Sequence, residues 1–307
     1  MKIAIVFPGQ GSQSVGMMNG FTDTAVEKTF AEAKAITGID YWAMAGEGPA
    51  ELQNQTVNTQ PLMLVAGVAT WRAWRERGGQ MPAYFAGHSL GEYSALVAAE
   101  AMRFEEALPL VRFRAQAMQE AVPEGTGGIA AILGLDDAKL PQVLAEAAQG
   151  QVVEAANLNS PGQIVIAGHR AAVERAMAAA KEAGAKRAVM LPMSAPSHCS
   201  LMKPAAERLR ERLDQVEIRK PVVPVVHNRF VESFDDPPRI KLSLIEQLDH
   251  PVRWIETVEF LARAGVQRIV ECGPGKVLTG LSKRIAAGVE CLPIQDSAAL
   301  EAAAKQG

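Results

Sequence analysis

The residues best suited to chemistry form the pentapeptide Gly-His-Ser-Leu-Gly at positions 87–91, which fits the pattern G-x-S-x-G. Residues 83–86 before it could form a short buried strand, and residues 90–99 after it are good helix formers without proline. A strand, a sharp turn and a helix are the context of a nucleophile elbow, which lifts a serine to the N-terminus of a helix. The alternative is a loop serine between two glycines. Because the flanking elements favour the elbow, we predict that Ser89 is a nucleophile.

A serine hydroxyl needs a neighbouring base to become a nucleophile, and the chain has five histidines. His88 adjoins the serine, and adjacent side chains at a strand end point apart. His169 falls at a helix start in a small inserted subdomain. His198 lies in a loop at a helix N-terminus, where two domains would enclose a cleft. We favour it as the base, with His227 and His250 left open. No acidic residue stands out to orient the imidazole, and a backbone carbonyl would serve equally well.

Arg114 falls in the middle of the apolar face of a helix predicted over residues 104–122. A guanidinium does not shed its charge, so one directed inward needs an anion or a network of hydrogen bonds. A buried arginine–carboxylate pair would satisfy it. Alternatively, Arg114 lies in a cleft and receives a substrate carboxylate through two hydrogen bonds. The helix pattern alone leaves both interpretations open.

Two glycine-containing loops resemble phosphate-binding motifs but do not match them. The loop at residues 8–13 follows the first predicted strand, yet Ser14 stands where a dinucleotide-binding fingerprint needs its third glycine. The loop at residues 273–276 is not a Walker A loop, because Val270 and Val277 replace required residues. The first loop can still present donors to a site, with Gln10 as its most prominent polar group. A solvated turn glutamine is the alternative.

Composition limits the class of protein. The 307 residues are 48% hydrophobic and 21% charged, which fits a soluble globular chain with a sizeable core. A net charge of −3 gives no electrostatic footprint for nucleic acid, and no apolar run reaches the roughly 20 residues of a membrane helix. The three cysteines lack C-x-x-C spacing, so we expect neither a disulfide framework nor a zinc site, and we expect a cytoplasmic protein.

The order of predicted elements indicates an α/β protein with two subdomains. Residues 125–193 follow the order βαββαβ of a ferredoxin-like unit, inserted between residues 1–124 and 194–307, which form the large subdomain. The insertion would form one wall of a cleft. The remaining elements are expected as helices near 24–36, 60–77, 201–213, 242–248, 255–264 and beyond 276 and 297, and as strands near 2–7, 224–227, 267–272 and 288–294.

Six motifs, taken in order along the chain, carry a family resemblance. They lie at residues 7–13 (FPGQGSQ), 87–94 (GHSLGEYS), 119–125 (QEAVPEG), 159–163 (NSPGQ), 196–199 (PSHC) and 273–278 (GPGKVL). Together they resemble the bacterial malonyl-CoA:acyl carrier protein transacylases of dissociated fatty acid synthesis. The acyltransferase domains of polyketide synthases share several of them.

The resemblance implies a large subdomain like the α/β-hydrolases and a role for each site residue. Ser89 would be acylated and His198 would be its base. Arg114 would bind the malonyl carboxylate. The Gln10 side chain and the Leu90 N–H would stabilise the oxyanion, and the carbonyl of Gln247 would orient His198. Charged residues before Pro251 depart from the family pattern and bear on the packing near Gln247.

The resemblance also implies the reaction, which is ping-pong transfer of a malonyl group from malonyl-CoA to the phosphopantetheine thiol of acyl carrier protein. Coenzyme A enters as part of the substrate, and neither a cofactor nor a metal is expected. We expect a monomer that binds neither nucleic acid nor membrane. A serine thioesterase or another hydrolase of the same fold is the main alternative, followed by a polyketide-type acyltransferase and by a non-catalytic module that binds the carrier.

Overall fold

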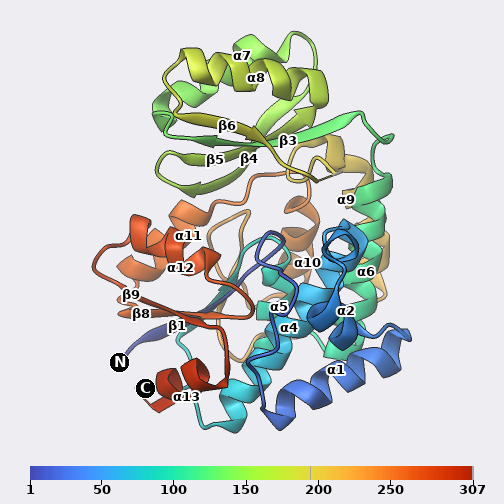
Figure 1. Cartoon of the computed structure of the whole chain (residues 1–307), viewed down its shortest axis with the longest axis vertical. Coiled ribbons are helices and arrows are strands. Elements are labelled where there is room, and N and C mark those ends of the chain that lie inside the picture. Colours follow the sequence, from blue (N-terminus) through green and yellow to red (C-terminus); the bar gives the residue numbers. More distant parts are fainter. Residues whose placement is uncertain (194, 306–307) are drawn as a thin grey trace.

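The computed structural model describes residues 1–193 and 195–305. Residues 194, 306 and 307, at the start and the end of the predicted segment 194–307, lie outside the described residues. Figure 1 shows two stacked parts. A small antiparallel sheet covered by two helices stands above a larger part, in which a parallel sheet is surrounded by helices.

The larger sheet is parallel and has the strand order β7-β2-β1-β8-β9. Its strands are β1 (Ile3–Phe7), β2 (Tyr84–Gly87), β7 (Val225–Val226), β8 (Arg268–Cys272) and β9 (Glu290–Ile294). Every residue of the central strand β1 is buried, as expected of a parallel sheet covered on both faces. Alternate side chains of β1 therefore enter two different cores, one on each face of the sheet.

Helices cover both faces of this sheet (Figure 1). The core on one face includes residues of α1, α4, α5, α6, α9, α10 and α13, and the core on the other includes residues of α11 and α12. The helices of the large part are α1 (Thr24–Thr37), α2 (Tyr41–Glu47), α3 (Ala50–Gln53), α4 (Thr56–Glu76), α5 (Gly91–Ala98), α6 (Phe104–Glu120), α9 (Lys203–Asp214), α10 (Pro237–Glu246), α11 (Trp254–Arg263), α12 (Val277–Ile285) and α13 (Ser297–Lys305).

The small sheet is antiparallel and has the strand order β4-β5-β3-β6. Along the chain its elements follow the order βαββαβ, and α7 and α8 cover its outer face (Figure 1). They are β3 (Gly127–Leu133), α7 (Leu140–Ala148), β4 (Val153–Ser160), β5 (Gln163–His169), α8 (Arg170–Glu182) and β6 (Arg187–Met190). The unit has its own apolar core, and its elements lie inside the predicted range 125–193.

Direct contacts hold the small sheet on the large part. The Leu158 N–H donates to the carbonyl of Val252, and the Val252 N–H donates to the carbonyl of Ala156, both over 2.9 Å. Arg284 of α12 also donates to side-chain oxygens of Ser160 and Gln163. Residues of strand β4 therefore bond to a loop of the large part, so the space between the two parts has a defined shape.

The predicted class, an α/β protein with a parallel sheet and an inserted βαββαβ unit, is confirmed. The structure differs locally from the prediction. Helix α10 begins at Pro237 rather than near residue 242, because prolines are tolerated in the first turn of a helix, where their missing N–H is not needed. Strand β6 ends at Met190 rather than at residue 193. The short helices α2 and α3 were not predicted.

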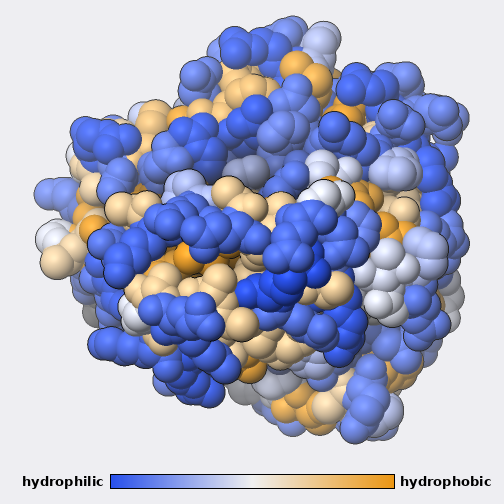
Figure 2. All heavy atoms as spheres, turned by 90° about the horizontal axis from the view of Figure 1, so that it is seen from above, coloured by the Kyte–Doolittle hydropathy of each residue, from blue (hydrophilic) through white to orange (hydrophobic). Residues whose placement is uncertain are grey.

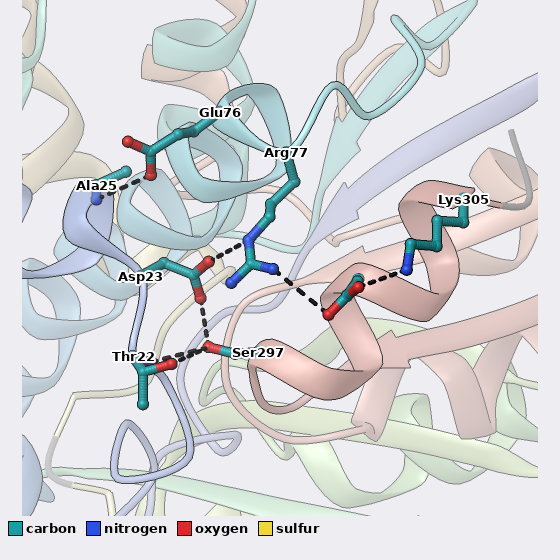
Figure 3. A network of polar contacts seen from close by, with 8 residues as sticks. Thr22, Asp23, Ala25, Glu76, Arg77, Ser297 and Lys305 are labelled. Atoms are coloured by element: carbon teal, nitrogen blue, oxygen red, sulfur yellow. Dashed lines mark hydrogen bonds and ion pairs between the residues drawn. The ribbon is translucent and has the colours of Figure 1, made fainter.

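The C-terminal helix α13 is attached to the rest of the molecule by a polar network (Figure 3). Arg77 donates to Asp23 over 2.7 Å and also faces Glu301 of α13. Ser297, the first residue of α13, donates to Asp23 and accepts from the Thr22 N–H. Because the side chain of Asp23 is only 1% exposed, this carboxylate is a buried anchor between α13 and the end of α4.

The surface seen from above the small sheet is mostly hydrophilic, with apolar residues between the polar ones (Figure 2). Within the part of the chain that the structure describes, no helix is both long and apolar enough to cross a bilayer.

Candidate active site

The nucleophile elbow forms where predicted, between the end of β2 at Gly87 and the start of α5 at Gly91. A Cβ atom at Gly87 would lie 1.9 Å from the carbonyl carbon of Gly91, and one at Gly91 would lie 2.0 Å from the carbonyl oxygen of Phe7. No side chain fits at either place. Between the two glycines, Ser89 has a φ of 53°, a left-handed conformation that residues other than glycine seldom adopt. The turn presents Ser89 half-buried, two residues before the helix.

The hydroxyl of Ser89 faces the imidazole of His198. Ser89 Oγ lies 2.7 Å from His198 Nε2, and His198 Nδ1 lies 2.7 Å from the backbone carbonyl of Gln247. A carbonyl only accepts, so the proton of a neutral imidazole is on Nδ1, and Nε2 is free to accept the serine proton. The structure thus brings together Ser89, His198 and the carbonyl of Gln247, the three groups predicted to act as nucleophile, base and orienting acceptor.

Burial keeps His198 neutral. Its side chain is enclosed, and its backbone has a φ of 62°, with its N–H donating to the carbonyl of Leu248. Loss of water, followed by the positive charge of Arg114, lowers the pKa of His198 to about 3. The imidazole therefore has a free lone pair at neutral pH, which is the state that a general base requires.

The other histidines have different partners. His227 contacts Glu92, and His88 contacts Asn159 of the small sheet. His250 contacts the carbonyl of Glu246 and the carboxylate of Asp249, so the two side chains before Pro251 have local hydrogen-bond partners. None of these three rings contacts the hydroxyl of Ser89 within the described residues. Among the candidates left open by the sequence, His198 is the one whose ring contacts the Ser89 hydroxyl within the described residues.

Cys199, which adjoins the base, is not an alternative nucleophile. Its thiol is fully buried and contacts the carbonyl of Pro196, and burial raises its pKa to about 12. The reactive form of a cysteine is the thiolate, which this environment disfavours. The three cysteines are buried and free. Within residues 1–193 and 195–305, no group of three or more His, Cys, Asp or Glu side chains is arranged to hold a metal ion.

Arg114 lies on the buried face of α6, where the periodicity placed it, and is only 1% exposed. Its guanidinium donates to the side-chain oxygen of Gln60 over 2.6 Å and to that of Gln247 over 2.9 Å. It also lies 3.3 Å from Ser89 Oγ and stacks near the ring of Tyr93. It forms no ion pair with a carboxylate of the described residues. The interpretation of Arg114 as half of a buried ion pair is therefore wrong.

A cavity of about 360 Å³ lies between the two parts of the molecule. Its lining includes Gln10, Ser89, Leu90, Arg114 and His198 from the large part, and residues of β3, β4 and β5 from the small sheet. The expectation that the insertion forms one wall of a cleft is confirmed. Gln247 does not line the cavity, but it contacts two residues that do, Arg114 and His198.

The two residues expected to stabilise an oxyanion both reach this cavity. Gln10 Nε2 is held by Thr56 Oγ1 over 3.4 Å. The backbone N–H of Leu90 follows the nucleophile and has no acceptor within the described residues. A free N–H at this position can donate to an oxygen that gains charge next to the serine. That these two groups form an oxyanion hole stays a prediction.

The two glycine loops meet beside the elbow. A Cβ atom at Gly9 would lie 2.4 Å from the carbonyl oxygen of His88, and one at Gly275 would lie 3.0 Å from the carbonyl oxygen of Ser12. Glu271, buried at the end of β8, accepts from the N–H groups of Leu278 and Thr279 and so fixes the start of α12. These glycines therefore allow close backbone packing around the site.

A buried polar network behind the elbow was missed by sequence reasoning. Glu92, fully buried on α5, accepts from the His227 ring, the Asn228 N–H and the Gln247 side chain over 2.6–3.0 Å. Asn228 in turn accepts from the Ser89 N–H and donates to the carbonyl of Gly87. The network therefore fixes the backbone of Ser89, the strained residue of the turn, and that of Gly87. The sequence signals that could have revealed the network were Glu92, the single acidic residue of α5, and the pair His227-Asn228 directly after strand β7.

This arrangement, a serine with a neutral histidine base and a guanidinium beside the hydroxyl, is suited to forming and breaking an ester on the serine. Comparison with known proteins agrees. The model of the acyl transferase domain family matches residues 4–287. The malonyl CoA-acyl carrier protein transacylase of Salmonella typhimurium is 55% identical over 307 residues, covering 99% of each chain.

Solved structures give the same result. An acyl-carrier-protein S-malonyltransferase from Burkholderia pseudomallei superposes with a TM-score of 0.97 at 55% identity, covering 99% of this chain and 100% of that one. A malonyl-transacylase solved in complex with its type II PKS acyl-carrier protein superposes with a TM-score of 0.98 at 50% identity, covering all of both chains. The chain therefore belongs to the malonyl CoA-acyl carrier protein transacylase family of acyl transferases.

Proposed function

We propose that this protein transfers a malonyl group from malonyl-CoA to the phosphopantetheine thiol of acyl carrier protein through a malonyl ester of Ser89. The observation that carries the proposal is the position of Arg114. Its guanidinium lies 3.3 Å from Ser89 Oγ without a carboxylate partner in the described chain. A substrate carboxylate that pairs with Arg114 brings its acyl carbon close to the hydroxyl. The activity in the names of the relatives supports the same reaction.

In the first half of the reaction, malonyl-CoA enters the cavity and its carboxylate pairs with Arg114. Ser89 Oγ attacks the thioester carbonyl while its proton passes to His198 Nε2. Gln10 and the Leu90 N–H donate to the oxyanion, and one such donor is worth roughly 10²–10³ in rate. The C–S bond then breaks, coenzyme A takes the proton from His198, and the malonyl ester remains on the serine.

In the second half, the phosphopantetheine thiol of the carrier replaces coenzyme A. Its proton passes to His198 as the sulfur attacks the ester carbonyl, and the same donors hold the oxyanion. The C–O bond breaks, and the proton returns from His198 to Ser89. Throughout both halves, the carbonyl of Gln247 holds Nδ1–H, so Nε2 faces the serine each time. The proposed setting is the cytoplasm, with the protein as a monomer.

The experiment compares transfer with hydrolysis. The purified protein is mixed with malonyl-CoA, with and without the phosphopantetheine form of acyl carrier protein, and malonyl-carrier and free malonate are measured. We expect malonyl-carrier as the product and only slow release of malonate without carrier. Rapid malonate release without carrier would instead identify a hydrolase. Carriers of fatty acid synthesis and of a type II PKS are compared in the same assay, because one similar protein was solved with a carrier of the latter kind.

A further inference from the structure

Among the described residues, the hydrogen-bond acceptors of Arg114 are all neutral oxygens. Its acceptors are the side-chain amide oxygens of Gln60 and Gln247 and the hydroxyl of Ser89, and its Nε atom is buried without a partner. A buried guanidinium usually pairs with a carboxylate, because an uncompensated buried charge is costly. The described residues here supply hydrogen bonds without supplying the opposite charge.

The carboxylate whose charge acts on Arg114 is Glu92, and it is engaged elsewhere. Its two oxygens accept from His227, from the Asn228 N–H and from the Gln247 side chain. The Gln247 amide lies between Glu92 and Arg114, with its NH₂ group toward Glu92 and its oxygen toward Arg114. A neutral amide thus separates the two buried charges.

Gln60 is the fifth residue of α4 and is only 2% exposed. Its oxygen accepts from Arg114, and its nitrogen lies 3.5 Å from the sulfur of Met118, which is a weak acceptor. The orientation of this amide is therefore set by the guanidinium. A glutamate at this position would have nearly the same shape, would make the same hydrogen bond and would add a negative charge.

We propose that Gln60 is a positioning residue that holds Arg114 by a neutral oxygen, so that the guanidinium keeps its charge for a carboxylate carried by the acyl group of the substrate. The inference rests on the proposed function and explains how the site would prefer malonyl over acetyl groups. An internal carboxylate at position 60 would occupy the guanidinium and repel the malonyl carboxylate, whereas an acetyl group has no charge to lose.

The test is Gln60→Glu, with kcat/KM for acylation measured separately for malonyl-CoA and acetyl-CoA. Hydrogen bonds to charged groups contribute enough that we expect malonyl kcat/KM to fall about 10- to 100-fold, while acetyl kcat/KM changes less than about threefold. Loss of folded protein would lower both rates equally and leave their ratio unchanged. In a Gln60→Glu protein whose fold is verified by circular dichroism, a malonyl-to-acetyl ratio within about threefold of the unmodified protein would overturn the inference.

Two further variants separate charge from position. Asn54→Asp adds the same charge at an exposed residue of the cavity lining that makes no hydrogen bond to Arg114, and it keeps an acceptor for Gln13; we expect it to leave the ratio unchanged. Gln60→Ala removes the hydrogen bond without adding charge, and we expect a lower rate with the malonyl preference retained. If Gln60→Ala loses the preference as fully as Gln60→Glu, the contribution is geometric and the inference is wrong. Should Gln60→Glu not fold, Gln60→Ala decides alone: a retained malonyl preference supports the inference, and a lost preference overturns it.

The Arg114→Ala background completes a double-mutant cycle. Because Gln60 acts through Arg114, Gln60→Glu should change the ratio in the parent protein and leave it unchanged once Arg114 is absent. An equal change in both backgrounds would contradict the inference. Failure of the proposed function gives a different result, since the unmodified protein would then release malonate rapidly without loading the carrier, or would form no malonyl-serine ester at all.

Discussion

The buried position of His198 leads to a specific pH dependence. Its pKa is about 3, because burial and the neighbouring Arg114 both disfavour the imidazolium. Protonation of Nε2 removes the lone pair that accepts the serine proton, so activity is lost as pH falls through the pKa of the folded protein. An ordinary histidine with a pKa of about 6.5 would be about 97% protonated at pH 5, which would lower the rate about 30-fold. With a pKa near 3, by contrast, only about 1% of His198 is protonated at pH 5, so the rate hardly changes.

The assay is rapid-quench measurement of kcat/KM for malonyl transfer to the protein between pH 8 and pH 5, since this parameter reports the free enzyme. We expect less than about a twofold fall from protonation of the base. Arg114→Ala, assayed with acetyl-CoA, removes the second of the two main causes of the low His198 pKa. We therefore expect the His198 pKa to be higher in this variant than in the parent protein. Because burial remains, it should still lie below that of an ordinary histidine. Return to pH 7.5 before assay controls for unfolding. An apparent pKa near 6.5 in the parent protein would refute the reasoning.

Three other substitutions test separate parts of the account. His198→Ala should lower the acylation rate about 10²- to 10⁴-fold, the usual contribution of a general base, and a rate close to that of the parent would exclude His198 from this role. Glu92→Leu leaves the buried donors of Asn228 and Gln247 without their acceptor and should lower the free energy of unfolding in urea by about 2–4 kcal/mol; no loss would mean that the network contributes little. Asp23→Ala removes the anchor of α13 and should lower the free energy of unfolding by about 1–3 kcal/mol in the same measurement without changing acylation. Because Asp23 does not line the cavity, a selective loss of acylation would contradict this purely structural role.

The local features of the site were readable in the sequence. The elbow depends on a pentapeptide whose two glycines allow contacts that any Cβ would block, and the strand and helix around it are continuous in the chain. Arg114 was placed on a buried face by helix periodicity, which depends only on residues of α6. Periodicity could not decide whether a carboxylate faces the Arg114 guanidinium, because the facing residues come from α4 and from the loop containing Gln247.

Contacts between distant segments were not predictable from pattern alone. The bond between Ser89 and His198 joins residues 109 positions apart, so the choice among three histidines needed the fold. The Glu92 network joins residues 135 to 155 positions apart, and it was missed because each member has an ordinary local explanation. The short helices α2 and α3 were also missed; both are of seven residues or fewer and have little periodicity to detect.

The central claim is that Ser89 carries the malonyl group. The most direct measurement is the intact mass of the protein after mixing with malonyl-CoA, followed by identification of the modified peptide. The account predicts one malonyl group per chain on the peptide containing Ser89, and none on the Ser89→Ala protein with its fold verified by circular dichroism. A malonyl adduct that persists in Ser89→Ala, or that maps to another residue, would contradict it.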